Sequence, residues 1–513
     1  MTMKKIIFIA VSALTALFAS CNMDKFPHGS ILESEGVKTM SDAEQLRVSI
    51  YTPMKGLIVG ARHDIEELRG GMFNAMADFG NTYGTFHSWM MQVNDTDVES
   101  LWYADYSVIA SVNYAIGAYE KLLADEMSGL SEANKKQVAM FLAEAHVTRA
   151  LAYWDLVTKY CVAYDPALHA NGEDHLGLPL TWEYNPTSDV TQYPGRSSLK
   201  ETYDFIIADL TAAMDMPTLG ATNSNYYTKD VVKALLARVQ LNMKDWTNAA
   251  KNAQEVINTN TYTLASSEAD LEGLYNADTS NELLFVVAGS QNDSPGSTGS
   301  LYIYDTEKRD GSTPDPQYIP SQTLLDLYDA ENDMRYPIFF KTKTVTVEGA
   351  GTEDLELMWK FVGNPEFRTA ATQLNYINAG KIRISEMYLT LAEAAANMGG
   401  EGLNVAQETL NTLRAARIKN YTDETYTARD IMSAIKAEWS REFVGEGFRM
   451  INLKRWNDDM VRGTSQNSAM TKSDTGYDGL EKSMSDARCL WPIPKKEMDV
   501  NPQIKGQQNS GYN

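Results

Sequence analysis

The sequence contains few cysteines, and they lie far apart. Three cysteines in 513 residues are too few for a disulfide scaffold. The stretch before Cys21 predicts that this cysteine is acylated, as described below, so only Cys161 and Cys489 remain to form a disulfide. These two fit a disulfide and a pair of buried free thiols equally well.

Basic residues are scarce too. Lys and Arg number 45 against 68 Asp and Glu, which gives a net charge of −23 at pH 7. Such a chain repels a phosphate backbone, and no stretch gathers its cations into a basic stripe. Nucleic acid is therefore excluded as a main partner. Hydrophobic residues make up 43% and aromatic residues 10%, which is enough for a large core.

Catalytic motifs are missing as well. There is no His-Glu-x-x-His, Gly-x-Ser-x-Gly, phosphate-loop or Cys-x-x-Cys pattern, and the six histidines do not cluster as metal ligands. Residues 94–99 offer oxygen ligands for calcium but lack the full EF-hand pattern, so we interpret them as a solvated loop. We expect a protein that is not an enzyme and holds no cofactor and no metal.

The first residues predict an exported lipoprotein. Two lysines precede an apolar run at residues 6–19, which is shorter than the roughly 20 residues of a membrane span but typical of a secretory signal. The run ends in Leu-Phe-Ala-Ser-Cys, a lipobox in which the sulfur of Cys21 is acylated and the chain is cut before it. A secreted protein with a chance cysteine is the alternative. Several acyl chains would anchor the protein stably.

Hydrophobic periodicity predicts helices along much of the chain. Residues 41–57 begin with a capping-box pattern, Ser41 to Glu44, and residues 131–160 place apolar side chains on one face. Residues 102–123 and 198–213 show similar spacing.

Residues 228–258 predict a helical hairpin of tetratricopeptide type. Thr228 can cap the first helix, and a turn near residue 244 leads to a second helix with several small alanines. A similar pair is predicted at residues 385–398 and 405–418. The fold class is therefore mainly α, with tetratricopeptide-like helical hairpins stacked as a solenoid, long loops and a few short β-hairpins. Residues 282–287 and 342–348 are the predicted strands.

Three blocks in the last third of the chain resemble the SusD/RagB family. Residues 383–394 (RISEMYLTLAEA), 438–456 (EWSREFVGEGFRMINLKRW) and 491–512 (from WPIP to QNSGY) follow the family's order. Residues 149–154 and 281–285 also fit. Asn452 stands where an aspartate is usual, Trp439 where an arginine is common, and Ser510 where the family has a proline.

The resemblance implies a function. Members of this family capture oligosaccharides, or in one branch oligopeptides, and deliver them to a TonB-dependent outer-membrane transporter. We therefore expect that a lipid anchor holds the protein at the cell outer membrane and that the protein faces the outside of the cell. Residues 1–20 would be the signal peptide, residues 21–30 a lipidated tether, and residues 31–513 a single binding domain. A lipoprotein glycoside hydrolase is the remaining alternative.

The charged residues of the 438–456 block are spaced three or four apart, as in a helix. We interpret Glu438, Arg441, Glu442 and Glu446 as a structural ion-pair network and not as acid–base catalysts. Glu386 and Glu393 receive the same interpretation.

Ligand capture calls for exposed aromatic rings beside amides and carboxylates, because sugar rings stack on aromatic faces while their hydroxyls need polar partners. Two loop-like stretches have this composition, residues 78–89 and residues 291–320. The predicted ligand-binding residues are Asp78, Asn81, Tyr83, Trp89, Tyr302 and Tyr304.

Overall fold

A computed structural model describes most of the chain. The described residues are 36–57, 60–125, 128–216, 225–290, 296–297, 300–303, 314–367, 376–377 and 379–512. Cys21, the predicted lipid attachment site, and Tyr304 lie outside them. Within the described ranges, no helix combines the length and the hydropathy that a membrane span requires.

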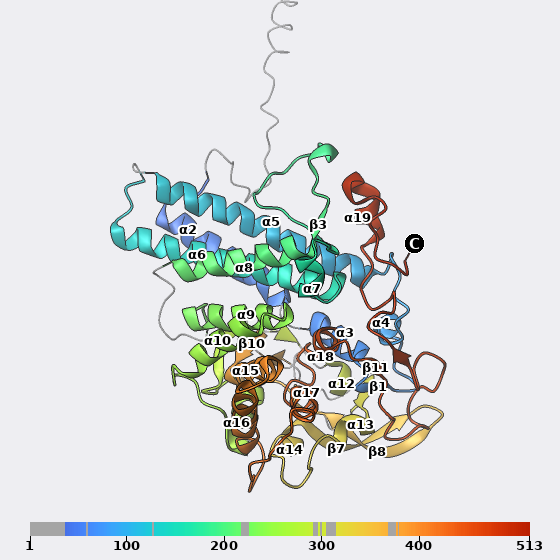
Figure 1. The fold of residues 1–513 in the computed structure, drawn as a ribbon. Coiled ribbons are helices and arrows are strands. Elements are labelled where there is room, and N and C mark those ends of the chain that lie inside the picture. Colours follow the sequence, from blue (N-terminus) through green and yellow to red (C-terminus); the bar gives the residue numbers. More distant parts are fainter. Residues whose placement is uncertain are drawn as a thin grey trace, which may run out of the picture.

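Long helices form one layer of the molecule, at the top of Figure 1. They pack along one another and bury a continuous apolar core. Their bounds are α2 (Met40–Leu57), α5 (Thr96–Ala124), α6 (Glu132–Tyr160) and α8 (Leu199–Asp215).

The second half of the helical series lies beneath this layer (Figure 1). Its members are α9 (Lys229–Asn242), α10 (Trp246–Ile257), α15 (Ile384–Met398), α16 (Gly402–Ala415) and α17 (Ile431–Glu442). Packing runs without a break from α5 to α6, α8, α9, α10, α15 and α16. The predicted stack of helical hairpins is thus confirmed.

Local capping explains where several helices begin. The side chains of Ser131 and Thr228 accept hydrogen bonds from backbone amides in the first turns of α6 and α9. Ser198 and Glu201 form a complete capping box at α8. Because these side chains satisfy amides that no helical carbonyl can reach, they fix the helix starts.

Two sequence predictions about helix starts are wrong. The capping box of α2 is formed by Thr39 and Asp42: the Asp42 amide donates to Thr39 Oγ1 at 3.2 Å, and the Thr39 amide donates to Asp42 Oδ2 at 2.9 Å. It therefore lies two residues before the predicted Ser41 pattern. Helix α5 begins at Thr96, inside the stretch interpreted as a loop. Asp97 and Glu99 favour a helix there, because acidic side chains stabilise the positive end of the helix dipole.

The strands are short and pair two by two, with a second apolar core beside them. The predicted hairpin at residues 342–348 is confirmed as the pair β7 and β8, and the run at residues 282–287 as β4. The pairs are β1 (Phe73–Ala75) with β6 (Tyr318–Pro320), β2 (Leu176–Pro179) with β3 (Arg196–Ser198), β4 (Leu283–Val287) with β10 (Ala379–Arg383), β5 (Gly296–Ser297) with β9 (Tyr376–Ile377), β7 (Phe340–Val347) with β8 (Gly351–Met358), and β11 (Met460–Val461) with β12 (Glu481–Lys482).

Short helices connect these parts. They are α3 (Ala61–Arg69), α4 (Gly84–His87), α7 (Pro166–Ala170), α11 (Glu268–Asn276), α12 (Ser300–Ile303), α13 (Gln322–Leu325), α14 (Tyr336–Phe339), α18 (Arg449–Trp456) and α19 (Lys495–Val500), with 3₁₀ turns η2 (Val190–Gln192), η3 (Pro365–Phe367) and η4 (Pro502–Ile504). Cys161 and Cys489 are both buried free thiols, which decides between the two alternatives left by the sequence.

A buried ion-pair network joins α17 to the strands and loops around it. Glu442 accepts hydrogen bonds from Arg335, Arg383 and Arg417 at 2.7–2.9 Å. Glu438 binds Arg335 and Arg441, each at 2.6 Å. The structural interpretation of the 438–456 block is thus confirmed.

The interpretation of Glu386 and Glu393 of α15 as structural ion-pair residues is also confirmed. Glu386 pairs with Arg238 at 2.6 Å, and Glu393 pairs with Arg455 at 2.7 Å. All four side chains are largely buried, so the pairs tie α15 to α9 and α18.

Candidate functional site

Three segments far apart in the sequence meet beside α4. Strand β1 pairs with β6, and directly after it Met76 bridges to Thr471 while the Ala77 amide donates to the Met470 carbonyl at 3.0 Å. The hydroxyl of Tyr318 donates to the Thr82 carbonyl at 2.6 Å. The fold therefore brings the two predicted ligand-binding stretches together and adds a third from residues 470–478.

The side chains exposed at this meeting point form a surface that we call the Asn81 patch, made of Asp78, Asn81, Tyr83, Lys472 and Tyr477. The Tyr477 hydroxyl donates to Asn81 Oδ1 at 3.4 Å, and the Lys472 ammonium lies 5.2 Å from the centre of the Tyr477 ring. Asp78 and Asn81 are exposed, and the other three are half-buried. The Tyr477 ring, on which the buried His87 imidazole stacks with 5.5 Å between ring centres, thus lies beside the Asn81 amide and the Lys472 ammonium.

The rings under the patch are packed in place. Phe79 meets Tyr318 edge-on on one side and Tyr477 edge-on on the other, with 5.6 Å between ring centres in both contacts. The β7–β8 hairpin contacts the patch through the Glu348 amide, which donates to Asp78 Oδ2 at 3.4 Å. The patch is therefore held by buried aromatic contacts from below and by a hairpin at its edge.

The backbone of the patch adopts an unusual conformation. Gly80, Asn81 and Tyr83 have φ of 66°, 61° and 54°, in the left-handed region. Asparagine tolerates this region, whereas a tyrosine pays a steric cost there. Strained residues of this kind persist where surrounding contacts impose them, and they gather at binding and catalytic sites. Trp89, in the same stretch, also has a φ of 58°, so the contacts around this loop impose the left-handed conformation at both a surface ring and a buried one.

Tyr83 can act as a hydrogen-bond donor at any physiological pH. Burial, together with the negative charges of Asp97 and Asp64, raises the pKa of the Tyr83 hydroxyl to about 12. Its proton is thus available to an acceptor such as a sugar oxygen.

Two predicted binding residues lie inside the protein. The Trp89 ring is fully buried, donates from Nε1 to the Arg69 carbonyl at 3.1 Å and lies 4.9 Å from the Arg69 guanidinium. Tyr302 is also fully buried and stacks on Phe73 with 4.7 Å between ring centres. Because protein atoms cover both rings, neither can contact a ligand in this conformation. Asp78, Asn81 and Tyr83 are accessible at the surface.

Sequence reasoning missed Tyr477 and Lys472. They lie almost 400 residues after Asn81, and no periodic pattern links the two loops. Their segment, KSDTGYDG at residues 472–479, combines glycine, acidic and aromatic residues, as residues 78–89 do. This composition could have marked the segment as a candidate binding loop.

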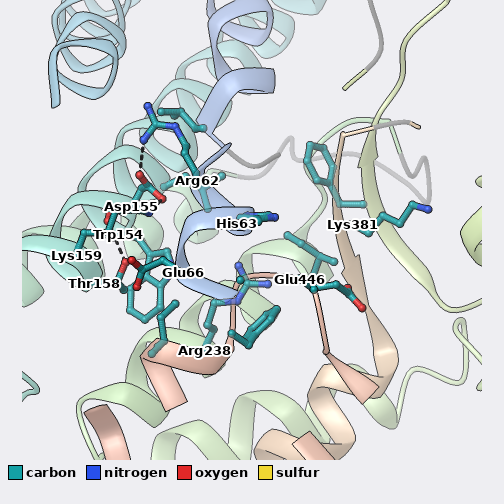
Figure 2. A pocket seen from close by; sticks show the side chains of 18 of the residues that line it. Arg62, His63, Glu66, Trp154, Asp155, Thr158, Lys159, Arg238, Lys381 and Glu446 are labelled. Carbon is teal, nitrogen blue, oxygen red and sulfur yellow. Dashed lines mark hydrogen bonds and ion pairs between the residues drawn. The ribbon is translucent and has the colours of Figure 1, made fainter. Parts of the chain in front are cut away.

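A second candidate is a cavity of about 110 Å³ between α3, α6 and the turn that leads into α18 (Figure 2). Aromatic side chains such as Trp154 and Phe448 form part of its wall. Gly445 and Gly447 line its floor with φ of 79° and 81°, and a Cβ atom at Gly447 would lie 2.9 Å from the ring of His63. The two glycines therefore allow a close approach of this turn to its neighbours.

The charged groups of this cavity are engaged with one another. Arg62 pairs with Asp105 at 2.7 Å and also with Asp155, which in turn binds Lys159. Glu446 pairs with Arg383 and Lys360. Although burial opposes ionisation, Lys159 and Arg62 lower the pKa of Asp155 to about 2. Arg383 and Lys360 likewise lower the pKa of Glu446, so both carboxylates favour the ionised form in structural ion pairs, and neither is suited to donate a proton as a glycosidase acid does.

His63 points into the same cavity (Figure 2). Burial, together with the charge of Lys159, lowers the pKa of its imidazole to about 4, so the ring is neutral at physiological pH. Apolar side chains form most of the lining of this cavity, and its charged groups are held in ion pairs with other residues. We interpret it as part of the scaffold.

Comparison with known proteins identifies the family. A model described as the SusD family matches residues 241–512, slightly more than half of the chain, and one described as "Starch-binding associating with outer membrane" matches residues 44–241. The chain belongs to the SusD family. No curated protein matches it.

Solved structures of SusD-like proteins share the fold. A SusD superfamily protein of Bacteroides vulgatus superposes with a TM-score of 0.75 at 21% identity, covering 93% of this chain and 100% of its own. One from Bacteroides thetaiotaomicron gives 0.74 at 24% identity, with coverage of 92% and 99%. A protein named surface glycan-binding protein A from Bacteroides fluxus gives 0.68 at 20% identity, with coverage of 92% and 100%.

Two departures from the SusD pattern lie next to each other. Trp439 and Asn452 are both buried and line the same small cavity of about 10 Å³ beside α18. The Trp439 ring packs against Phe443 and Phe448, with 5.2 and 5.6 Å between ring centres. Both positions carry neutral side chains in this chain.

Proposed function

We propose that this protein is a lipid-anchored binding protein of the outer membrane that captures oligosaccharides and delivers them to a TonB-dependent transporter. Family membership over the described chain supports a binding role, because both family models describe this class of protein. The lipobox at Cys21 supports the anchor. The observation that carries the choice of cargo is the Asn81 patch, where the Tyr477 hydroxyl donates to Asn81 and the half-buried Tyr83 follows two residues later in the same loop.

The chemistry of the patch suits a sugar. The C–H face of a pyranose ring is apolar and packs on an aromatic face, while its hydroxyl groups exchange hydrogen bonds with amides and carboxylates. The Asn81 amide, the Asp78 carboxylate and the Tyr83 hydroxyl provide both donors and acceptors. A shallow surface of this kind can hold part of a long chain without enclosing it.

Isothermal titration against a panel of soluble polysaccharides and their oligosaccharides tests this function. We expect one of them to bind the wild-type protein, and we expect Tyr477→Ala to weaken that binding about fivefold, since a stacked ring contributes about 1 kcal/mol. Asn81→Ala should weaken it as well.

Tyr421→Ala is the matched control. Tyr421 is also half-buried, and its hydroxyl donates to an asparagine, Asn411 Oδ1, at 2.7 Å, but it belongs to a different surface after α16. Its loss should leave affinity unchanged. Binding of oligopeptides with no binding of any polysaccharide would show that the cargo is peptide.

A further inference from the structure

The loop between β2 and β3 presents aromatic side chains outside the Asn81 patch. Trp182 is 61% exposed and is the most exposed of the nine tryptophans, all of which lie in described segments. Tyr184 is 49% exposed and meets Tyr114 of α5 edge-on, with 5.5 Å between ring centres. We call Trp182, Tyr184 and Tyr114 the Trp182 platform.

The backbone beneath the platform is fixed by buried polar groups. Arg149 Nη1 donates to the Trp182 carbonyl at 2.9 Å, and Asn113 Nδ2 donates to the Thr181 carbonyl at 3.0 Å. The Thr181 amide donates to the Tyr153 hydroxyl at 2.8 Å. Arg149 is itself held by two hydrogen bonds to Asp209, of 2.8 and 2.7 Å. Exposed rings are thus carried on an immobilised segment.

The Trp182 ring rests on a stack of buried groups. It packs on Phe205 with 4.0 Å between ring centres. Phe205 in turn lies 4.9 Å from the Arg149 guanidinium and contacts Tyr153 edge-on. Since one side of the indole is supported and 61% of the residue is exposed, a ring surface remains open to solvent. Preorganised surfaces bind more tightly because less side-chain entropy is lost on binding.

The polar groups of the loop limit what can bind there. Residues 180–195 include Glu183 and Asp189 but no lysine or arginine, and the whole chain has a net charge of −23. Phosphate groups of nucleic acids and anionic lipids would be repelled. Exposed amides are close at hand, since Asn185 Nδ2 donates to Gln192 Oε1 at 3.3 Å. Open aromatic faces beside amides and carboxylates suit a neutral, hydroxyl-rich ring.

We infer that the Trp182 platform is a second glycan-binding site, which takes one pyranose unit of a neutral polysaccharide on the indole of Trp182. This inference rests on the proposed function and adds a location and a ligand class to it. The site is built on the loop after β2, whereas the Asn81 patch is built on the segments around β1 and β6. Each can therefore be removed without altering the other.

The test uses the full-length protein and whichever polysaccharide of the panel binds the wild type. Trp182→Ala and Tyr184→Ala are each expected to weaken polysaccharide binding about fivefold. Tyr226→Ala is the matched control, because Tyr226 is 41% exposed but packs against Arg47 of α2. Its affinity should equal that of the wild type. Unchanged thermal unfolding would show that the variants fold.

Fluorescence supplies a second measurement. Acrylamide, a neutral quencher that the acidic surface does not repel, quenches exposed indoles, so Trp182 dominates the quenchable emission, and bound polysaccharide should protect it. Protection should persist in Tyr477→Ala at saturating polysaccharide and vanish in Trp182→Ala. Wild-type affinity in both platform variants, or quenching that polysaccharide does not change, overturns the inference while leaving the proposed function intact.

Two further outcomes also count against the platform as a glycan site. If the platform variants bind polysaccharide normally but no longer co-purify with the transporter, the platform is a protein contact. If the wild type binds no polysaccharide of the panel, the proposed function fails, and this inference fails with it.

Discussion

At the scale of single residues, Glu67 is a buried carboxyl group that burial keeps partly protonated. Its Oε1 accepts hydrogen bonds from the amides of Gly447 and Arg449, at 2.9 and 3.3 Å. Burial raises the pKa of Glu67 to about 7, against the partial opposing effect of backbone amides and of the Arg449 and Lys360 charges. The unfolded chain, in contrast, loses this proton near its usual pKa of about 4.5.

Glu67→Gln is expected to stabilise the protein at high pH. Because the unfolded state releases the proton first, stability falls as pH rises from about 4.5 through 7, and the loss is complete above that range. Glutamine keeps the acceptor for both amides and removes the buried charge. We expect the free energy of unfolding to rise by about 1–3 kcal/mol at pH 8 and to change little at pH 4. Urea unfolding at both pH values measures it.

An exposed glutamate provides the comparison. Glu353 lies on the outer face of β8, so Glu353→Gln should change stability by less than about 0.5 kcal/mol at either pH. Equal destabilisation of Glu67→Gln at both pH values would show that the amide contacts, and not the buried charge, dominate at this position.

The buried ion pairs show what sequence periodicity can and cannot predict. Glu438 and Arg441 are three residues apart on one helix, and their pairing follows from spacing alone. Arg335 reaches Glu438, and Arg383 reaches Glu442, from positions 50 or more residues earlier in the chain. No periodicity relates such positions, so only the folded chain reveals these partners.

Trp439 and Asn452 are two buried neutral residues that line one cavity. A buried cation left without its anion, or the reverse, is strongly destabilising, and neutral side chains at both positions avoid that cost.

At the scale of elements, the helices and the β7–β8 hairpin could be predicted because their patterns repeat within 10 to 20 residues. Which individual aromatic side chains are exposed could not be predicted from the sequence. Trp89 and Tyr83 belong to one glycine-rich stretch with the same composition, yet one ring is in the core and the other is at the surface. The partner that buries Trp89 is Arg69 of α3, and the partner that completes the Asn81 patch is Tyr477; neither is close in sequence.

Helix α10 packs against α9 and α15 through small side chains. Ala249, Ala250 and Ala253 are all buried. Ala253→Leu would force extra methylene groups between helices and should lower the free energy of unfolding by about 1–3 kcal/mol. Lys251→Leu, on the exposed face of the same helix, adds a similar side chain without overpacking and should cost less than about 0.5 kcal/mol. Similar losses in both variants would contradict close packing at Ala253.

At the scale of the whole molecule, the proposed anchor decides where the protein works. The binding surfaces belong to the described body, whereas Cys21 precedes it by 15 residues, between 21 and 36. A protein held at a membrane by acyl chains on one residue needs no spanning helix.

Cys21→Ala should therefore release the protein from the membrane. We expect the wild type to sediment with outer membranes and the variant to appear in the soluble fraction, because acyl chains contribute about 0.8 kcal/mol per buried CH₂. The assay belongs in cells that lack the partner transporter, so that protein contacts cannot retain the variant. Cys161→Ala, at a buried thiol, is the control and should stay with the membrane. Equal sedimentation of both variants would contradict lipidation at Cys21.

The way the β2–β3 loop is held has a consequence for how specificity can change. Asn113, Arg149 and Tyr153 bind the peptide groups of residues 181 and 182, and none of these hydrogen bonds involves the side chain of Trp182 or Tyr184. A different pair of side chains at positions 182 and 184 could be mounted on the same anchored backbone. Mutations at positions 182 and 184 can therefore change which ligand the loop binds while the hydrogen bonds that hold its backbone stay the same.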